Sequence, residues 1–173
     1  MGCDIHAFLE YKSKVDATSF WEPFSGELNI YRNYDMFALL AGVRGFHNKS
    51  LPPKGLPKDL SYELKDELYY AVNYSLKTPV GTEVDVGTAL RWANGNQDKL
   101  ICDDEHNPIF VQHPDFHTPS WVSYKEYKNV CKNYIKDHGK FQHFATVWEA
   151  ILILMEHLEN KKFETRLVFW FDS

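Results

Sequence analysis

The first six residues of the chain place a carboxylate and an imidazole two positions apart, at Asp4 and His6. Residues two apart on a β-strand point to the same side of a sheet, and Cys3, Ile5 and Ala7 alternate with this pair. We therefore predict a first strand with one face in the core and Asp4 and His6 on the other. Such a pair suits metal binding or general acid–base catalysis, and a structural ion pair is the competing interpretation.

A second group of imidazoles and carboxylates occurs late in the chain, at His113, Asp115 and His117. Pro114 and Pro119 disfavour a helix there, so we expect an extended segment that projects the three side chains to one side. If the two groups meet, they offer ligands for zinc, manganese or magnesium, namely Asp4, His6, His113, Asp115 and His117. No spacing shows that they meet, and surface histidines on a loop are the alternative.

A third group, from Arg32 to Asp35 together with Arg44, could bind an anion, because guanidinium groups bind phosphate and carboxylate in a bidentate manner. Asp35 and Gly42 are expected to begin and end a short buried helix between these arginines. Structural ion pairs are an equal alternative. We predict Asp4, His6 and His117 as catalytic residues, and as ligand-binding residues Arg32, Asn33, Tyr34, Arg44, Ser120 and Trp121.

The elements that must position these groups are strands at both ends of the chain. The segment 166–172 is rich in β-branched and aromatic residues, and we expect it to pair with the first strand and hold Asp4 and His6 on rigid backbone. A hairpin partner is expected at 18–24 and a proline-rich loop, able to serve as a lid or a protein contact, at 47–57.

Three further helices are expected. Apolar spacing predicts helices at about 61–73 and about 143–158, and Ser123 with Glu126 forms a capping box for a third helix, stapled by Val122 and Tyr127. Short strands are expected in a less regular insertion at about 78–112. The predicted fold class is α+β, with a mainly antiparallel sheet that pairs the terminal strands and is covered by three to four helices.

Composition narrows the classes of partner. The 173 residues suit a single domain, and the net charge of −5 with dispersed Lys and Arg argues against binding of long nucleic acid. Three cysteines without a C-x-x-C pair predict free thiols in a reducing cytosol, and no segment predicts a signal peptide or a membrane partner. Aromatic residues make up 16% of the chain, which favours a pocket for a small anionic or nucleotide-like ligand. A homo-oligomer is left open.

Several islands of the sequence resemble small proteins of bacteriophage and prophage genomes that begin Met-Gly-Cys-Asp-Ile-His. The resemblance extends over 32–35, 40–45, 53–57 with Asp59 and Ser61, 117–121 and 168–172. It implies a phage protein in the cytoplasm of an infected bacterium. By analogy with other phage accessory proteins, it suggests action against host defence, such as the degradation or sequestration of a nucleotide second messenger.

The leading hypothesis is therefore a hydrolase of a small phosphate-containing or nucleotide-like ligand, working by acid–base chemistry or with a divalent metal. The first alternative is a non-catalytic sponge for such a nucleotide signal. The second is a protein-binding inhibitor of a host defence enzyme.

Overall fold

The structure, a computed structural model, describes residues 2–94, 100–102 and 109–173. These residues divide into two compact units, one made of Met1–Ser61 with His117–Ser173 and the other of Tyr62–Phe116. The first unit contains both ends of the chain, and the second is a single continuous segment. The single-domain organisation with an insertion at about 78–112 stays a prediction.

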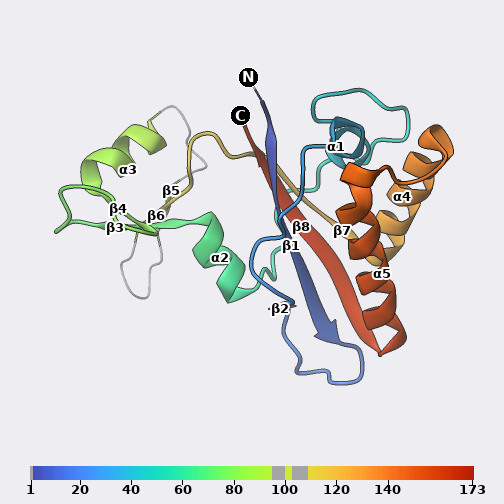
Figure 1. The fold of residues 1–173 in the computed structure, drawn as a ribbon. Helices are drawn as coiled ribbons and strands as arrows, with labels where there is room; N and C mark the ends of the chain where they lie inside the picture. Colours follow the sequence, from blue (N-terminus) through green and yellow to red (C-terminus); the bar gives the residue numbers. More distant parts are fainter. Residues whose placement is uncertain (1, 95–99, 103–108) are drawn as a thin grey trace. The chain divides into compact units, whose positions relative to one another are not determined.

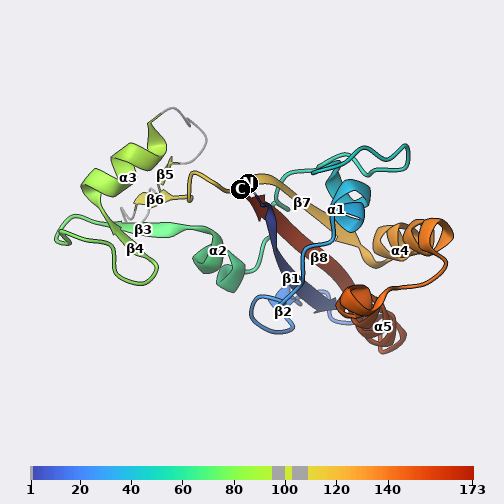
Figure 2. The same ribbon diagram turned by 45° about the horizontal axis from the view of Figure 1, so that its top comes forward.

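The first unit is built on a four-stranded antiparallel sheet in the order β2-β1-β8-β7. The long central pair is β1 (Asp4–Ser13) and β8 (Phe163–Asp172), aligned so that Asp4 faces Asp172 and Ser13 faces Phe163. The edge strands are β2 (Glu22–Pro23) and β7 (His117–Ser123). The two termini consequently lie side by side (Figure 2), which confirms the predicted pairing of the terminal strands.

Three α-helices cover one face of this sheet (Figure 1): α1 (Tyr34–Ala41), α4 (Tyr124–His138) and α5 (Thr146–Asn160), the last preceded by the 3-10 turn η2 (His143–Ala145). Alternate residues of β1 and β8 supply the sheet's side of the core, including Ile5, Leu9 and Phe169. The fold-class prediction is therefore confirmed. Within the described residues, no helix is both long and apolar enough to span a membrane.

The predicted ends of α1 are half right. Gly42 follows the last turn with a φ of 68°, which a side chain would oppose, and its N–H donates to the carbonyl of Ala38. The N-cap, however, is Asn33 and not Asp35, because the Asn33 side chain accepts the Met36 N–H. Asp35 lies inside the first turn of the helix.

Helix α4 begins as predicted. The Ser123 side chain accepts from the Glu126 backbone, and the Glu126 carboxylate accepts from the Ser123 backbone N–H, so both halves of the capping box form. Two other predictions need correction. The strand expected at 18–24 comprises only the two residues of β2, and the helix expected at 61–73 ends at Leu68.

The second unit contains a small mixed sheet in the order β4-β3-β6-β5 and two helices. In chain order these are α2 (Tyr62–Leu68), β3 (Tyr70–Asn73), β4 (Glu83–Asp85), α3 (Val86–Ala93), β5 (Leu100–Cys102) and β6 (Ile109–Val111). Strands were predicted in this region, whereas α3, capped by Asp85, was not. Residues 95–99 and 103–108 of the predicted insertion lie outside the described residues.

Candidate functional site

Five charged or titratable side chains meet where the two termini are joined. Asp4 and His6 lie on β1 and Asp172 ends β8, while Glu27 and Arg32 come from the segment between β2 and α1. Because β1 and β8 are antiparallel and in register, Asp4 and Asp172 are direct partners on one face of the sheet. We call these five residues the terminal cluster. The predicted placement of Asp4 and His6 on one face is thus observed.

Asp4 and Arg32 form a bidentate ion pair. The Arg32 Nε and Nη2 atoms donate to the two Asp4 carboxylate oxygens at 2.5 and 2.6 Å. The hydrogen bonds from Arg32 hold the pKa of Asp4 below its usual range. Gly2 makes this arrangement accessible, because a Cβ atom at that position would collide with the Arg32 guanidinium. The role of Asp4 in this geometry is to orient Arg32.

His6 lies between two carboxylates. Its Nδ1 atom is 2.9 Å from a Glu27 oxygen, and its Nε2 atom is 3.3 Å from an Asp172 oxygen. The hydrogen bond to Glu27 is the main cause that raises the pKa of His6, with Asp172 adding to it against the opposing effect of burial. The ring also stacks on Trp170 with a centroid distance of 5.7 Å. An imidazolium held in a fixed plane is suited to proton donation.

The second predicted arginine reaches the same corner of the molecule. Arg44 Nη2 donates to the backbone carbonyl of Gly2 at 2.9 Å, on the residue against which Arg32 also packs. Arg44 adopts a φ of 59°, which is uncommon for a residue with a side chain. Two guanidinium groups therefore converge on the N-terminal backbone beside Asp4.

A pocket of about 350 Å³ opens beside these groups, lined by Asp4, Ile5, His6, Glu27, Leu28, Asn29 and Ile30. Its size falls within the range of small-ligand sites, roughly 300–1,000 Å³. Its polar wall is formed by Asp4, His6 and Glu27 of the terminal cluster together with Asn29, and its apolar wall by Ile5, Leu28 and Ile30. A small polar ligand could enter it with His6 at one side.

The structure does not bring His117 together with Asp4 and His6 at this pocket, and its catalytic role stays a prediction. His117 is the register partner of Phe171 and stacks on that ring at 5.9 Å. Phe171 belongs to the helix-covered core face, whereas Asp4 and His6 lie on the opposite face. Side chains alternate along β8, so His117, paired with Phe171, and His6, paired with Trp170, lie on opposite faces of the sheet.

The segment before His117 is also not extended as predicted. Residues 114–115 form a turn closed by a hydrogen bond from the Phe116 N–H to the His113 carbonyl, and His113 Nδ1 lies 3.6 Å from an Asp115 oxygen. His113 and Asp115 belong to the second unit and His117 to the first. Among the described residues, no three His, Cys, Asp or Glu side chains are grouped so as to hold a metal ion.

The other predicted ligand-binding residues have varied surroundings. Asn33 is buried, caps α1 and donates to the Tyr134 hydroxyl, and Ser120 is buried and accepts the Lys54 N–H. These contacts are structural. Tyr34 is partly exposed and packs edge-on against Phe37. Trp121 is half-buried on the edge strand β7, where its register partner is Val168, and it does not line the pocket beside His6.

Sequence reasoning did not identify Glu27 or Asp172. Pairing the terminal strands would have placed Asp172 near Asp4, since the expected last strand ended at that residue. No comparable signal exists for Glu27, which lies in an irregular segment whose Leu28 N–H donates to the Ala7 carbonyl. Together with the bond from the Phe24 N–H to the Leu9 carbonyl, this contact holds the segment against β1, where Glu27 reaches His6.

A separate ion network is buried further along the same two strands. Arg166 donates to Glu10 at 2.6 Å and to Asp59 at 2.7 Å, and its guanidinium lies 3.9 Å from the centre of the Trp21 ring. Glu10 also accepts the Ser61 N–H. Glu10 and Arg166 are 0% and 3% exposed. The Asp59 side chain is 63% exposed, and we call the buried pair of Glu10 and Arg166, with Asp59 at its edge, the buried network.

Comparison with known proteins adds no assignment to this geometry. No family model, no curated protein and no solved structure matches the chain. The functional argument therefore rests on the residues of the terminal cluster and their surroundings.

Proposed function

We propose that the protein is a hydrolase of a small phosphate-containing or nucleotide-like ligand, with its reaction centre at the terminal cluster. The observation that carries the proposal is the His6 ring held between two carboxylates at the wall of a ligand-sized pocket. Arg32 and Arg44 converge beside it and would bind the anionic group.

In this reaction the guanidinium groups stabilise the negative charge that develops on the phosphoryl oxygens. A water molecule attacks phosphorus while the P–O bond to the leaving group breaks. The protonated His6 donates its proton to the leaving oxygen, and the proton released by the attacking water restores the imidazolium. Asp4 orients Arg32, and the hydrogen bonds to Glu27 and Asp172 raise the pKa of His6 and so favour its protonated form.

Sequestration without turnover is the second candidate. The same contacts also favour sequestration, because both His6 nitrogens and both Asp4 oxygens already have hydrogen-bond partners within the protein. A ligand held by the arginines alone would then be retained intact. In either case the proposed setting is the cytoplasm of an infected bacterium, where a phage protein would remove a nucleotide signal of host defence.

The two candidates are separated by incubating the protein with cyclic dinucleotides and ADP-ribose derivatives, then denaturing it with heat and chromatographing the mixture. New products support the hydrolase. Intact ligand that is released only by heating supports sequestration. A result in which the ligand is neither retained nor converted would contradict both candidates and favour the protein-binding alternative.

The site assignment is tested with His6→Ala against His157→Ala, an exposed histidine on α5. We expect His6→Ala to reduce turnover by about 100-fold or more, the usual contribution of a general acid. His157→Ala should leave the rate unchanged. Equal rates for the two variants, with equal thermal unfolding, would show that His6 is not the proton donor.

A further inference from the structure

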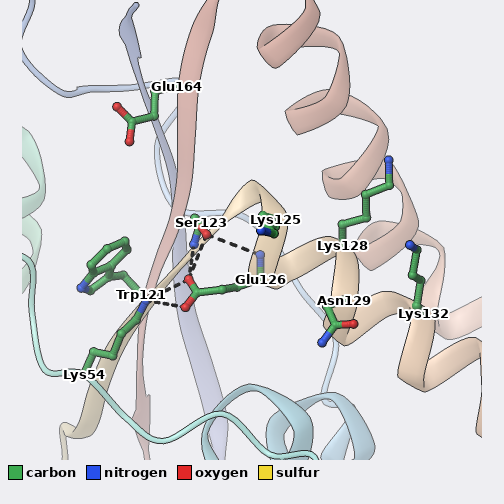
Figure 3. A pocket seen from close by; sticks show the side chains of 9 residues that line it. All are labelled: Lys54, Trp121, Ser123, Lys125, Glu126, Lys128, Asn129, Lys132 and Glu164. Carbon is green, nitrogen blue, oxygen red and sulfur yellow. Dashed lines mark hydrogen bonds and ion pairs between the residues drawn. The ribbon is translucent and has the colours of Figure 1, made fainter.

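A second and larger pocket lies in the first unit and shares no lining residue with the pocket beside the terminal cluster. It has a volume of about 720 Å³ and is formed by the edge strand β7, the start of α4 and the loop before Asp59. Four lysines and a tryptophan dominate its wall: Lys54, Trp121, Lys125, Lys128 and Lys132 (Figure 3).

Two of these lysines are neutralised by the protein itself. Lys54 Nζ lies 2.9 and 3.1 Å from the two Glu126 oxygens, and Lys128 Nζ lies 2.7 Å from a Glu156 oxygen. The other two are not, since across residues 2–94, 100–102 and 109–173 no carboxylate forms an ion pair with Lys125 or Lys132. Glu164 also lines the pocket and pairs with Lys12 at 3.3 Å, so the positive charges of Lys125 and Lys132 are left over in a chain whose net charge is −5.

The spacing of these lysines has an electrostatic cost to the fold. Lys125, Lys128 and Lys132 follow one another at intervals of three and four residues, so their like charges lie on one side of α4. Lys125 is also in the first turn, where the helix dipole disfavours a cation. Packing does not require these charges, because the buried side of α4 is formed by Tyr127, Val130, Cys131 and Tyr134.

The remaining wall is suited to a ring. Trp121 lines the pocket, and the Lys54 ammonium lies 3.5 Å from the centre of its indole (Figure 3). Behind it, the Arg166 guanidinium lies 5.9 Å from the same ring. The methylene stems of the lysines extend this apolar surface. A planar group could contact the indole while phosphates reach Lys125 and Lys132.

We infer that this lysine pocket binds a small ligand of the nucleotide class that carries two or more phosphate groups. The excess charge matches the phosphates, the indole matches the base, and the volume fits one such molecule. A long nucleic acid is a poorer match, because the rest of the chain is acidic and would repel it. The site is separate from the terminal cluster and does not depend on the proposed hydrolase activity.

Calorimetric titration of the whole protein with ATP, AMP and inorganic triphosphate tests the inference. We expect ATP to bind more tightly than either of the others, and Trp121→Leu to weaken ATP binding while leaving triphosphate binding unchanged. Absence of ATP binding would overturn the inference. So would equal affinities for ATP and triphosphate, or binding of a 20-nucleotide RNA without binding of ATP.

Matched charge variants test the location. The double variant Lys125→Gln with Lys132→Gln should weaken ATP binding at least tenfold. Its control is Lys136→Gln with Lys140→Gln, which removes the same charge near the other end of α4, outside the pocket. Equal losses in both doubles would indicate only a diffuse charge effect and would overturn the site. His6→Ala should bind ATP at this pocket as the parent protein does, whatever becomes of its turnover.

Discussion

Strands β1 and β8 carry two ion networks on the same face of one sheet, the terminal cluster at the chain ends and the buried network further along. Both join a carboxylate of β1 to a guanidinium, Asp4 to Arg32 and Glu10 to Arg166. They differ in burial, because the side chains of Asp4 and Arg32 are about half exposed, whereas Glu10 and Arg166 are almost completely enclosed.

This difference teaches that a shared face does not imply a shared role. A buried ion pair has lost its hydration and depends on each partner, so it fixes the register of the strands and the position of the Asp59 loop. A half-exposed pair beside a pocket contributes little to stability and remains accessible to a ligand. We therefore assign a structural role to the buried network, whereas chemistry at the terminal cluster remains our proposal.

The largest expected effect comes from breaking the buried network. Arg166→Met leaves Glu10 charged and buried without its cation, and we expect the free energy of unfolding to fall by about 3–5 kcal/mol. Urea denaturation measures the loss, and Lys161→Met, at an exposed position just before β8, is the control. A loss below about 1 kcal/mol would contradict the contrast between the two networks.

Removing both charges of the buried pair sharpens the comparison. In the double variant Glu10→Leu with Arg166→Met no unpaired charge remains at this point of the sheet, so we expect recovery of about half or more of the single-variant loss, roughly 2 kcal/mol. Ser61 N–H and Asp59 lose a partner, which keeps the recovery incomplete. The same urea experiment measures it, and no recovery at all would mean that packing of the Arg166 side chain dominates.

The pH dependence of the terminal cluster provides a third test. The pKa of His6 is raised above its unfolded value of about 6.5, so its contribution to stability is complete below that pH and is lost as the pH rises through the raised pKa. Glu27→Gln removes the largest cause of this shift, and we expect the His6 pKa to move down toward 6.5. Titration of the His6 ring by NMR measures the change, with Glu22→Gln as the control. An unchanged His6 pKa would remove Glu27 from the site.

The smallest expected effect on stability belongs to Asp4. Asp4→Asn removes a half-exposed ion pair, and we expect the free energy of unfolding to change by less than about 1 kcal/mol at low salt, and by less still at high salt, where exposed charges are screened. Denaturation in both salt conditions measures this. A loss as large as that of Arg166→Met would make the terminal cluster a structural network like the other.

Local patterns predicted part of this fold for clear physical reasons. The alternation along the first strand placed Asp4 and His6 together, and the capping box at Ser123 located the start of α4, because both depend on neighbours within three residues. The same reasoning failed where local signals compete. Asn33 and Asp35 can both cap a helix, and only the packing of α1, with Asn33 bonded to Tyr134, selects Asn33.

Long-range geometry explains the errors at the site. His117 was grouped with Asp4 and His6 by residue type, but the antiparallel register of β7 on β8 directs it to the core face. The lysine pocket was missed because Lys54 and Trp121 are 67 positions apart and meet only when the proline-rich loop joins β7. Sequence spacing contains no information about such contacts.

The sequence alone determined the polarity of the first strand and the cap of α4, since side-chain alternation and capping act over a few residues, and the composition of the last strand indicated a partner for the first. Only the tertiary structure decided which of two similar ion pairs is buried, which carboxylates hold His6 and where the lysines gather. These depend on strand register and on irregular segments, whose positions are set by packing across the whole sheet.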